Sequence, residues 1–480
     1  MFPRTRLVFP LLVFAAACAL NPVTGEQMFS LVSKEQEIAL GQQAAREIVQ
    51  TIPPVKDVEL QAYVERIGKA MARKTERPDL PWSFTVLDDP TVNAFALPGG
   101  PIFVTRGILT HLNSEAELAS VLGHEIGHIT ARHSVQQISK AQLAQLGLGV
   151  GVMLNPDLEG AAQVASAGLQ LMFLKFGRDD ERQSDELGFR YMLEQGYDPR
   201  EMANVFVTLG RASAVESKGS LPEWLSTHPD PENRVEAARQ RAAEVKSPPK
   251  RLEVGRDRFL AAVDGTVFGD DPRQGYFKGD AFLHPELRFQ LRLPQGWKTQ
   301  NTPRAVLAVS PKQDAVVQLS VGGTLSPEEA RRKFFAREGV RAAQAQEGKQ
   351  HLLPATGGYF EAQTEQGVLH GLVSFVSHGG STYMLVGYAP AGAFGGYDEA
   401  FRRALGSFAP LTDPAALSVS PARVDVVSVP SDMTLREFAA RWPSNVPLQV
   451  LAIVNGVEEG GSLRAGQRAK RIVGGPPYSR

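Results

Sequence analysis

The stretch GHEIGHITARH, residues 123–133, decides the fold class and carries three of the chain's nine histidines. His124 and His128 are four residues apart, so in an α-helix their side chains lie one turn apart on the same face. Glu125 follows the first histidine and lies beside that face. This H-E-x-x-H spacing predicts two imidazole ligands for zinc and a carboxylate that accepts a proton from the attacking water. The alternative is a buried amphipathic helix in which the histidines occur by chance.

The residues after this motif do not supply a third ligand in the metzincin spacing, H-E-x-x-H-x-x-G-x-x-H. A catalytic zinc site takes three protein ligands and leaves one position open. Ala131 stands where that spacing has glycine, and Ser134 stands where it has the third histidine. His133 is nine residues from His124, so a continuous helix turns it to the opposite side. We therefore predict that His133 is exposed or caps the end of the helix.

A second helix is predicted over FGRDDERQSDELGFRYMLEQG, residues 176–196, which is rich in helix formers and ends at Gly196. Glu181 and Asp185 are four residues apart and share one face, which suits Glu181 as the third zinc ligand. Asp185 then accepts the outer N–H of a ligand histidine and fixes the orientation of its ring. Arg178, one turn before Glu181, could neutralise these acids. The alternative is a solvated, charged helix face.

Several motifs of the chain occur together in one known family. They are VNAFALPGGPIFVTRGIL at residues 92–109, HEIGH, RDDERQSDELG with Ser184 in place of the usual alanine, and STHPDPENR at residues 226–234. Over roughly residues 20–245 the chain resembles the bacterial zinc metallopeptidases typified by HtpX and BepA, relatives of the CAAX prenyl proteases. The resemblance implies a mainly helical gluzincin peptidase domain that holds one zinc ion. In that family pattern, zinc is bound by His124, His128 and Glu181, and Glu125 is the general base.

The first of these motifs also predicts a β-hairpin. Short apolar runs at residues 94–97 and 102–105 flank the turn signal Pro98-Gly99-Gly100. A strand beside a metalloprotease site can bind an extended peptide through main-chain hydrogen bonds. An ordinary structural hairpin is the alternative, and the resemblance favours substrate binding. The predicted substrate-binding residues are Asn93, Ala94, Phe95 and Ala96.

The resemblance places His228 and Arg234 of the fourth motif near the zinc. Either side chain could take a catalytic role by stabilising the oxyanion of the tetrahedral intermediate. His228 could instead occupy the open zinc position in a resting enzyme. The alternative is a proline-rich turn followed by a capped helix at residues 230–238.

The N-terminal sequence MFPRTRLVFPLLVFAAAC predicts a signal peptide over residues 1–18, because its apolar run is too short to span a bilayer. Small residues before Cys18, the only cysteine, resemble a bacterial lipobox, with Ala15 where leucine is commonest. This predicts lipidation of Cys18; a plain cleavage site near Ala17 is the alternative. Ala19 favours sorting to the outer membrane. The expected location is the cell envelope, periplasmic and lipid-anchored to the outer membrane.

The rest of the chain predicts further elements and domains. Apolar stretches at residues 143–154 and 161–176 are too short or too interrupted to cross a membrane, and we predict a helical hairpin. It could cover the active-site cleft as a gate, and simple packing in the core is the alternative. The complete prediction is an α+β multidomain chain with a small edge-strand sheet in its peptidase domain. Its parts are residues 19–250 as the peptidase domain, 256–412 as an α+β accessory domain similar to PsbP, and 425–480 as a βααβ module similar to LysM.

Composition narrows the function. Charges are balanced at 51 basic and 52 acidic residues, and no basic stripe is present, so nucleic acid is excluded as the expected partner. The first hypothesis is an exported zinc endopeptidase that hydrolyses unfolded or misassembled envelope proteins, attached to the membrane by its lipid anchor only. The LysM-like module adds peptidoglycan as an expected partner. The second hypothesis is a non-enzymatic, chaperone-like or wall-associated scaffold with a closed zinc site.

Overall fold

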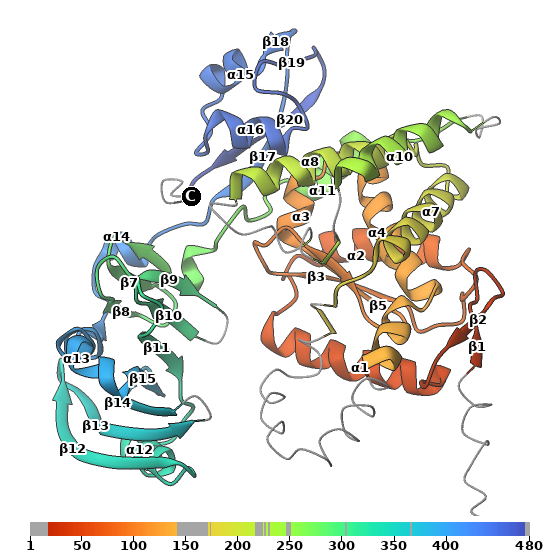
Figure 1. Cartoon of the computed structure of the whole chain (residues 1–480). Coiled ribbons are helices and arrows are strands. Elements are labelled where there is room, and N and C mark those ends of the chain that lie inside the picture. The colour runs from red at the N-terminus through yellow and green to blue at the C-terminus, as the bar shows by residue number, and fades with distance from the viewer. Residues whose placement is uncertain are drawn as a thin grey trace, which may run out of the picture. The chain divides into compact units, whose positions relative to one another are not determined.

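The computed structural model divides the chain into two compact units. Unit 1 comprises Met1–Gly269, Arg423–Val473 and Pro477–Arg480, and unit 2 comprises Asp270–Ala422 and Gly474–Pro476. The structure describes residues 18–141, 171–172, 174–216, 224, 227–228, 231–245, 251–302, 305–364 and 367–475 (Figure 1). The predicted signal peptide before Cys18 lies outside the described residues, as does the predicted helical hairpin except for its last few residues.

A three-stranded sheet forms the centre of unit 1. Its strands are β3 (Ser83–Leu87), β4 (Ala94–Ala96) and β5 (Pro101–Thr105), in the order β3-β5-β4. β5 runs parallel to β3 and antiparallel to β4, so the predicted hairpin is confirmed and β4 is an edge strand. Gly99 and Gly100 make its turn at φ of 77° and 129°, where residues with a Cβ are strained.

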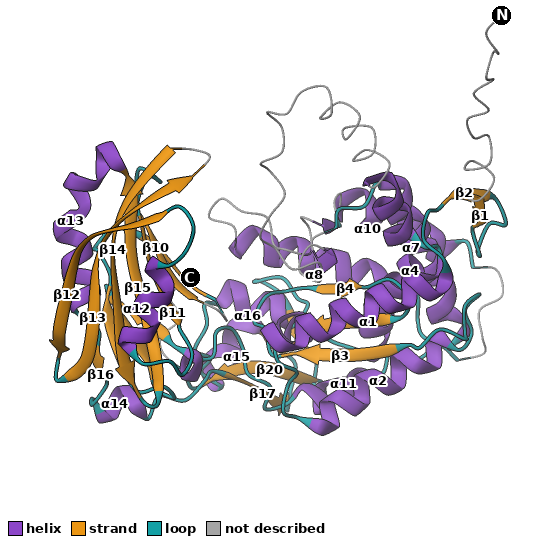
Figure 2. Ribbon diagram, turned by 90° about the horizontal axis from the view of Figure 1, so that it is seen from below, coloured by secondary structure: helices purple, strands orange, loops and turns teal. Residues whose placement is uncertain are grey.

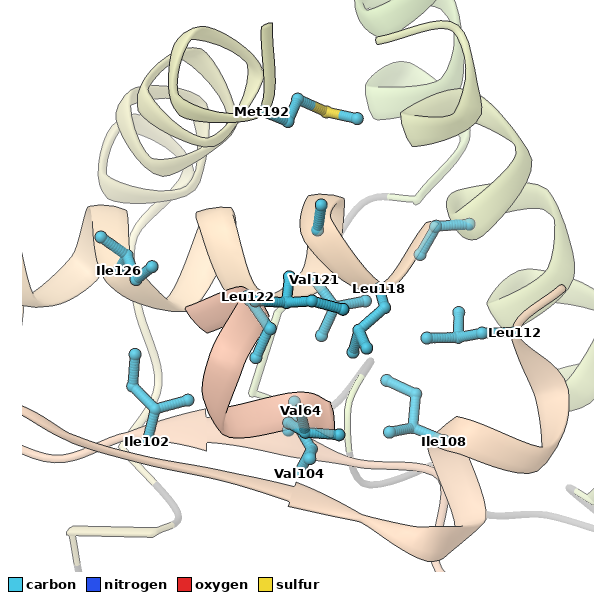
Figure 3. Close-up of a cluster of buried hydrophobic side chains, with 14 of the residues drawn as sticks. Val64, Ile102, Val104, Ile108, Leu112, Leu118, Val121, Leu122, Ile126 and Met192 are labelled. Atoms are coloured by element: carbon cyan, nitrogen blue, oxygen red, sulfur yellow. The ribbon is translucent and has the colours of Figure 1, made fainter. Parts of the chain in front are cut away.

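Helices cover both faces of this sheet. On one face, α1 (Lys34–Thr51) packs on Phe95 and Phe103. The other face, which carries Ile102 and Val104, packs on α2 (Val58–Ala72) and α4 (Glu115–Thr130). Side chains from α2, β5 and α4 converge there (Figure 3). Every residue of α4 is buried, so this helix is held from all sides in the core.

Glycine lets a second helix approach α4 unusually closely. α7 (Arg178–Glu194) forms within the predicted helix, and the chain turns at Gly196. A Cβ on Gly123 would lie 3.0 Å from the Cα of Gly188, and one on Gly127 would lie 3.0 Å from the Cα of Ser184. The two backbones therefore touch, and this contact brings the acids of α7 beside the histidines of α4.

The remaining elements of unit 1 surround this centre. Figure 2 shows helix, strand and loop along the chain. Helix α11 (Arg256–Val263) lies at the start of the predicted accessory domain, residues 256–412. In the structure it belongs to unit 1 and contacts α2 and α4. The remaining elements of unit 1 are β1 (Cys18–Leu20), β2 (Gln27–Phe29), α3 (Arg106–His111), α8 (Glu201–Glu216), α10 (Pro231–Ala243) and α11 (Arg256–Val263).

Residues 423–473, here called the C-terminal module, also belong to unit 1. Strands β17 and β20 pair with each other, and two short helices and a second strand pair, β18 with β19, lie between them in the sequence. Its elements are β17 (Arg423–Ser428), β18 (Met433–Thr434), α15 (Leu435–Arg441), α16 (Leu448–Val454), β19 (Ser462–Leu463) and β20 (Arg468–Val473). Its likeness to LysM stays a prediction.

Lys470 of β20 anchors the C-terminal module in unit 1. Its side chain is fully buried, and Nζ donates to the carbonyl oxygens of Thr110 at 2.8 Å and Leu112 at 2.7 Å. These carbonyls lie at the end of α3, where a helix leaves acceptors unpaired. Burial lowers the pKa of Lys470 to about 7, while the Glu117 carboxylate acts in the opposite direction.

Replacing Lys470 with methionine is expected to lower the free energy of unfolding of unit 1 by about 2–6 kcal/mol. Methionine fills a similar volume but leaves two buried carbonyls without a donor, at about 1–3 kcal/mol each. Urea unfolding of the full chain measures the change. Lys56→Met, at an exposed lysine of the same unit, is the control and is expected to change stability by less than about 0.5 kcal/mol. Equal effects of the two substitutions would contradict the anchoring role.

Unit 2 is dominated by an antiparallel sheet of seven strands in the order β12-β13-β14-β15-β11-β10-β9. Those strands are β9 (Lys298–Asn301), β10 (Ala305–Val309), β11 (Val316–Val321), β12 (Val340–Gln350), β13 (Leu353–Thr364), β14 (Gly367–His378) and β15 (Ser381–Pro390). A four-stranded sheet contains β6 (Tyr276–Lys278), β7 (Ala281–His284), β8 (Phe289–Arg292) and β16 (Ala409–Pro410). The helices are η3 (Pro272–Gln274), α12 (Pro327–Phe335), α13 (Ala391–Gly406) and α14 (Pro414–Leu417).

The predicted α+β class is thus confirmed in outline: a mainly helical region with small sheets precedes a region with a larger antiparallel sheet. Within the described residues, no helix is both long enough and apolar enough to span a bilayer.

Candidate metal centre

Four side chains bring possible metal ligands together in unit 1. His124 and His128 come from α4, Glu181 comes from the first turn of α7, and His228 precedes α10. One ligand atom from each lies within 4.8 Å of the other three, and all four residues are buried. In the described part of the chain this is the only group of His, Cys, Asp or Glu with such spacing. The histidines of unit 2 form no such group there.

The spacing of these atoms suits zinc. The Nε2 atoms of His124 and His128 are 3.0 Å apart, and they lie 3.5 and 3.4 Å from the carboxylate oxygens of Glu181. Atoms bound tetrahedrally to zinc at 2.0–2.1 Å lie about 3.3 Å from one another. Glu181 Oε2 is buried, and its charge is balanced by Arg234 Nη1 at 3.1 Å. A donor set of imidazole and carboxylate therefore fits a divalent zinc ion.

Asp185 fixes the orientation of the His124 ring. Its Oδ1 lies 2.9 Å from His124 Nδ1, and an ionised carboxylate can only accept a hydrogen bond. The neutral His124 ring therefore carries its proton on Nδ1 and presents the Nε2 lone pair to the ligand group. Burial works to raise the pKa of Asp185, but the Arg234 charge and the His124 hydrogen bond lower it to about 2. Asp185 is thus a stable carboxylate, as its predicted role requires.

Arg234 of α10 holds Asp185 in place. Its Nε and Nη2 donate to the two carboxylate oxygens of Asp185 at 2.8 Å each, and Nη1 forms an ion pair with Glu181 at 3.1 Å. The guanidinium lies over the rings of Phe206 and Trp224, at 4.3 and 4.8 Å from their centroids. These contacts give Arg234 a positioning role behind the ligands, and its predicted action on the oxyanion stays a prediction.

Arg178 does not perform the role proposed for it from the sequence. It is exposed at the first residue of α7, and the guanidinium that pairs with both acids is that of Arg234. Helical spacing placed Arg178 one turn from Glu181. The charges of Glu181 and Asp185 are instead balanced by Arg234 of α10, more than forty residues later in the sequence. Phe206 and Trp224 carried no motif that would have assigned them to the site.

Glu125 lies beside the ligand group without belonging to it. Its side chain is 1% exposed, and Oε1 accepts no hydrogen bond from a described residue. Burial raises the pKa of Glu125, against the opposing effect of His228 and His124. A raised pKa makes this carboxylate a stronger base, which suits it to accept a proton and release it again.

His228 is the fourth side chain of the ligand group. Its Nδ1 lies 2.9 Å from Glu181 Oε1 and 3.2 Å from His124 Nε2, and its Nε2 lies 3.7 Å from Glu125 Oε1. Its ring packs on Trp224, with centroids 5.1 Å apart. Of the two hypotheses for His228, this geometry favours occupation of the fourth ligand position.

The predicted exposure of His133 is wrong. The residue is 1% exposed, and its Nδ1 lies 3.0 Å from Nδ1 of His128. The sequence argument assumed a continuous helix, but α4 ends at Thr130 and Arg132 has a φ of 62°. The helix is interrupted by a turn at Ala131 and Arg132, and the His133 ring lies against His128.

Strand β4, predicted to bind substrate, lies next to α4, the helix that carries His124 and His128. β4 contacts α4, and Asn93, just before β4, is buried with both polar side-chain atoms lacking a hydrogen-bond partner among the described residues. Ala94, Phe95 and Ala96 are also buried. Substrate binding at this edge stays a prediction.

Comparison with known proteins gives an independent result. Residues 59–242 match Peptidase family M48. The chain is 31% identical to the "Beta-barrel assembly-enhancing protease" of Yersinia pestis over 238 residues, 48% of this chain and 49% of the relative. It is 35% identical to the "Mitochondrial metalloendopeptidase OMA1" of Arabidopsis thaliana over 176 residues, 36% of this chain and 34% of that protein. The chain thus spans about half or less of the length of these relatives.

Among solved structures, cyanobacterial PsbP from Synechocystis covers 27% of this chain at 12% identity, with a TM-score of 0.23. At that score the likeness carries no conclusion about the fold, and the PsbP-like accessory domain stays a prediction.

Proposed function

Starting from the M48 metallopeptidase region at residues 59–242, we propose that the whole chain is a zinc-dependent endopeptidase. The observation that carries the proposal is the meeting of His124, His128 and Glu181, with Glu125 beside them and outside the ligand group. This is the donor set of a catalytic zinc site together with an adjacent base.

The residues of the chain divide the chemistry among them. His124, His128 and Glu181 would hold the zinc ion, which would supply a Lewis acid for the scissile carbonyl and for the attacking water at neutral pH. Glu125 accepts the proton of the attacking water and passes it to the leaving amine. The edge of β4 binds the substrate main chain in an extended conformation.

We further propose that the enzyme rests in a closed state. His228 in the fourth ligand position leaves no place for water or a substrate carbonyl, so it must move before a peptide is cut. The scaffold hypothesis differs only in that His228 never moves. The intact set of Glu125 and three ligands favours the enzyme, because the Glu125 carboxylate is buried beside the ligand group and its Oε1 accepts no hydrogen bond from a described residue.

The substrates we propose are unfolded or misassembled proteins of the cell envelope. The name of the Yersinia pestis relative, a protease that enhances β-barrel assembly, supports this class. The hydrophobic N-terminal sequence supports export, and lipidation of Cys18 would anchor the chain to the outer membrane from the periplasmic side. Peptidoglycan binding by the C-terminal module is proposed from the LysM-like pattern of its sequence; its two short helices lie between the paired strands β17 and β20.

Metal content and proteolysis of one purified sample test the proposal. We expect about one zinc ion per chain, cleavage of unfolded casein, loss of both after chelation, and recovery on adding zinc. A folded globular protein such as intact lysozyme is the control substrate and should not be cut. The proposal fails if the chain binds no zinc when zinc is supplied. If zinc binds without cleavage, the activity of His228→Ala distinguishes a closed enzyme from a non-enzymatic scaffold.

A further inference from the structure

His133 is the unassigned residue with the closest contact to the metal centre. Its Nδ1 lies 3.0 Å from Nδ1 of His128, and 3.3 Å from Oγ of Ser184. On the other side of the ring, Nε2 lies 2.9 Å from Oε1 of Gln183 and 3.8 Å from Oδ1 of Asp180. No motif in the sequence and no step of the proposed mechanism uses this ring.

The position of His133 is fixed by contacts far away in the sequence. Arg132 adopts the left-handed conformation, which is unfavourable for a residue with a Cβ and persists only where its surroundings enforce it. The Arg132 side chain is 8% exposed; Nε donates to Oε2 of Glu37 at 3.0 Å, and Nη2 donates to the Val32 carbonyl at 3.0 Å. Arg77 donates to both Glu37 and the Ile129 carbonyl. This buried cluster stabilises the turn at Arg132 and thereby fixes the position of the His133 ring.

Hydrogen-bond chemistry assigns a direction to the contact between the two rings. His128 faces the ligand group with Nε2, so its lone pair must be on Nε2 when it binds a metal. A neutral imidazole then carries its proton on Nδ1, and that N–H must donate. The acceptor in reach is Nδ1 of His133. His133 in turn carries its proton on Nε2, which can donate to the amide oxygen of Gln183.

We propose that His133 is the positioning residue that accepts the Nδ1–H of His128, and so fixes the tautomer and ring orientation with which His128 binds the metal. The inference rests on the proposed zinc site. The two ligand histidines are then supported differently: His124 donates to a carboxylate held by arginine, and His128 donates to a neutral ring held by an amide. Partners of this kind typically change metal affinity by about 10- to 100-fold when they are removed.

The test compares two substitutions of nearly equal size at one position in the full chain. In His133→Asn, the Oδ1 atom stands where Nδ1 of histidine stood and can still accept. In His133→Leu, a methyl group of similar volume stands there and cannot. Zinc affinity, measured by competition with a chromophoric chelator, is expected to fall about 10- to 100-fold in His133→Leu. In His133→Asn it is expected to stay within about threefold of the wild type.

A second readout reports the hydrogen bond itself. In protein loaded with Co²⁺ in place of zinc, proton NMR detects the shifted ring N–H signals of the ligand histidines when hydrogen bonding protects them from exchange. The His128 signal is expected to persist in the wild type and in His133→Asn, and to be lost to exchange in His133→Leu. Gln183→Leu, at a partly exposed position, is a variant with little risk to folding and should weaken zinc binding to a smaller degree.

The outcomes separate this proposal from the proposed function. Equal zinc affinity in His133→Asn and His133→Leu, with the N–H signal present in both, would show that His133 only fills space. If the affinities differ as expected but no form cuts casein, the positioning role stands and the peptidase proposal fails. A wild type that binds no zinc overturns both.

Discussion

Replacing Glu125 with glutamine is expected to lower casein cleavage by roughly 10²- to 10⁴-fold while zinc stays bound. Glutamine has the shape of glutamate but cannot accept a proton, so the variant removes the base and leaves the volume of the buried site unchanged. Glu125 lies outside the ligand group of His124, His128, Glu181 and His228, so metal content is expected to equal that of the wild type.

The measurement is kcat/KM for cleavage of unfolded casein, together with zinc content of the same samples. Glu186→Gln, an exposed glutamate on α7, is the matched control and should cut casein as the wild type does. Unchanged cleavage in Glu125→Gln would remove Glu125 from the mechanism. Loss of zinc in that variant would instead indicate that the carboxylate contributes to metal binding.

Replacing His228 with alanine is expected to raise casein cleavage about tenfold or more. Catalytic zinc needs three protein ligands and an open position, and the Nδ1 atom of His228 stands in that fourth position, 2.9 Å from Glu181. Activity scales with the fraction of molecules in the competent state, so a site closed in nine molecules out of ten gains about tenfold when the block is removed. Zinc stays bound through His124, His128 and Glu181.

The double variant Glu125→Gln/His228→Ala is the control for this gain. It should be as inactive as Glu125→Gln alone, because the released activity depends on the same base. A fall in kcat with zinc retained in His228→Ala would contradict the closed state and would support the other hypothesis, in which His228 stabilises the oxyanion. No activity in any form, with zinc bound, would favour the scaffold.

Local spacing along the chain determined much of the site. His124 and His128 share a face because the helix repeat is intrinsic to the backbone, and the same argument paired Glu181 with Asp185. The hairpin at residues 94–105 followed from a turn signal between two apolar runs, and the α+β class followed from the alternation farther along the chain. These predictions needed only neighbours within a few residues of each other.

The tertiary structure alone decided where each of these elements meets the others. Sequence spacing placed His133 away from the site, but a turn held by Glu37, which lies 95 residues before Arg132, places it against His128. Sequence spacing suggested Arg178 as the partner of Glu181 and Asp185, whereas the arginine that pairs with them is Arg234 of α10. It also gave no sign that Lys470 donates hydrogen bonds to carbonyls 358 and 360 residues earlier in the chain. Helix periodicity is a local property, but the end of a helix and the neutralisation of a buried charge depend on groups that only the packed core brings together.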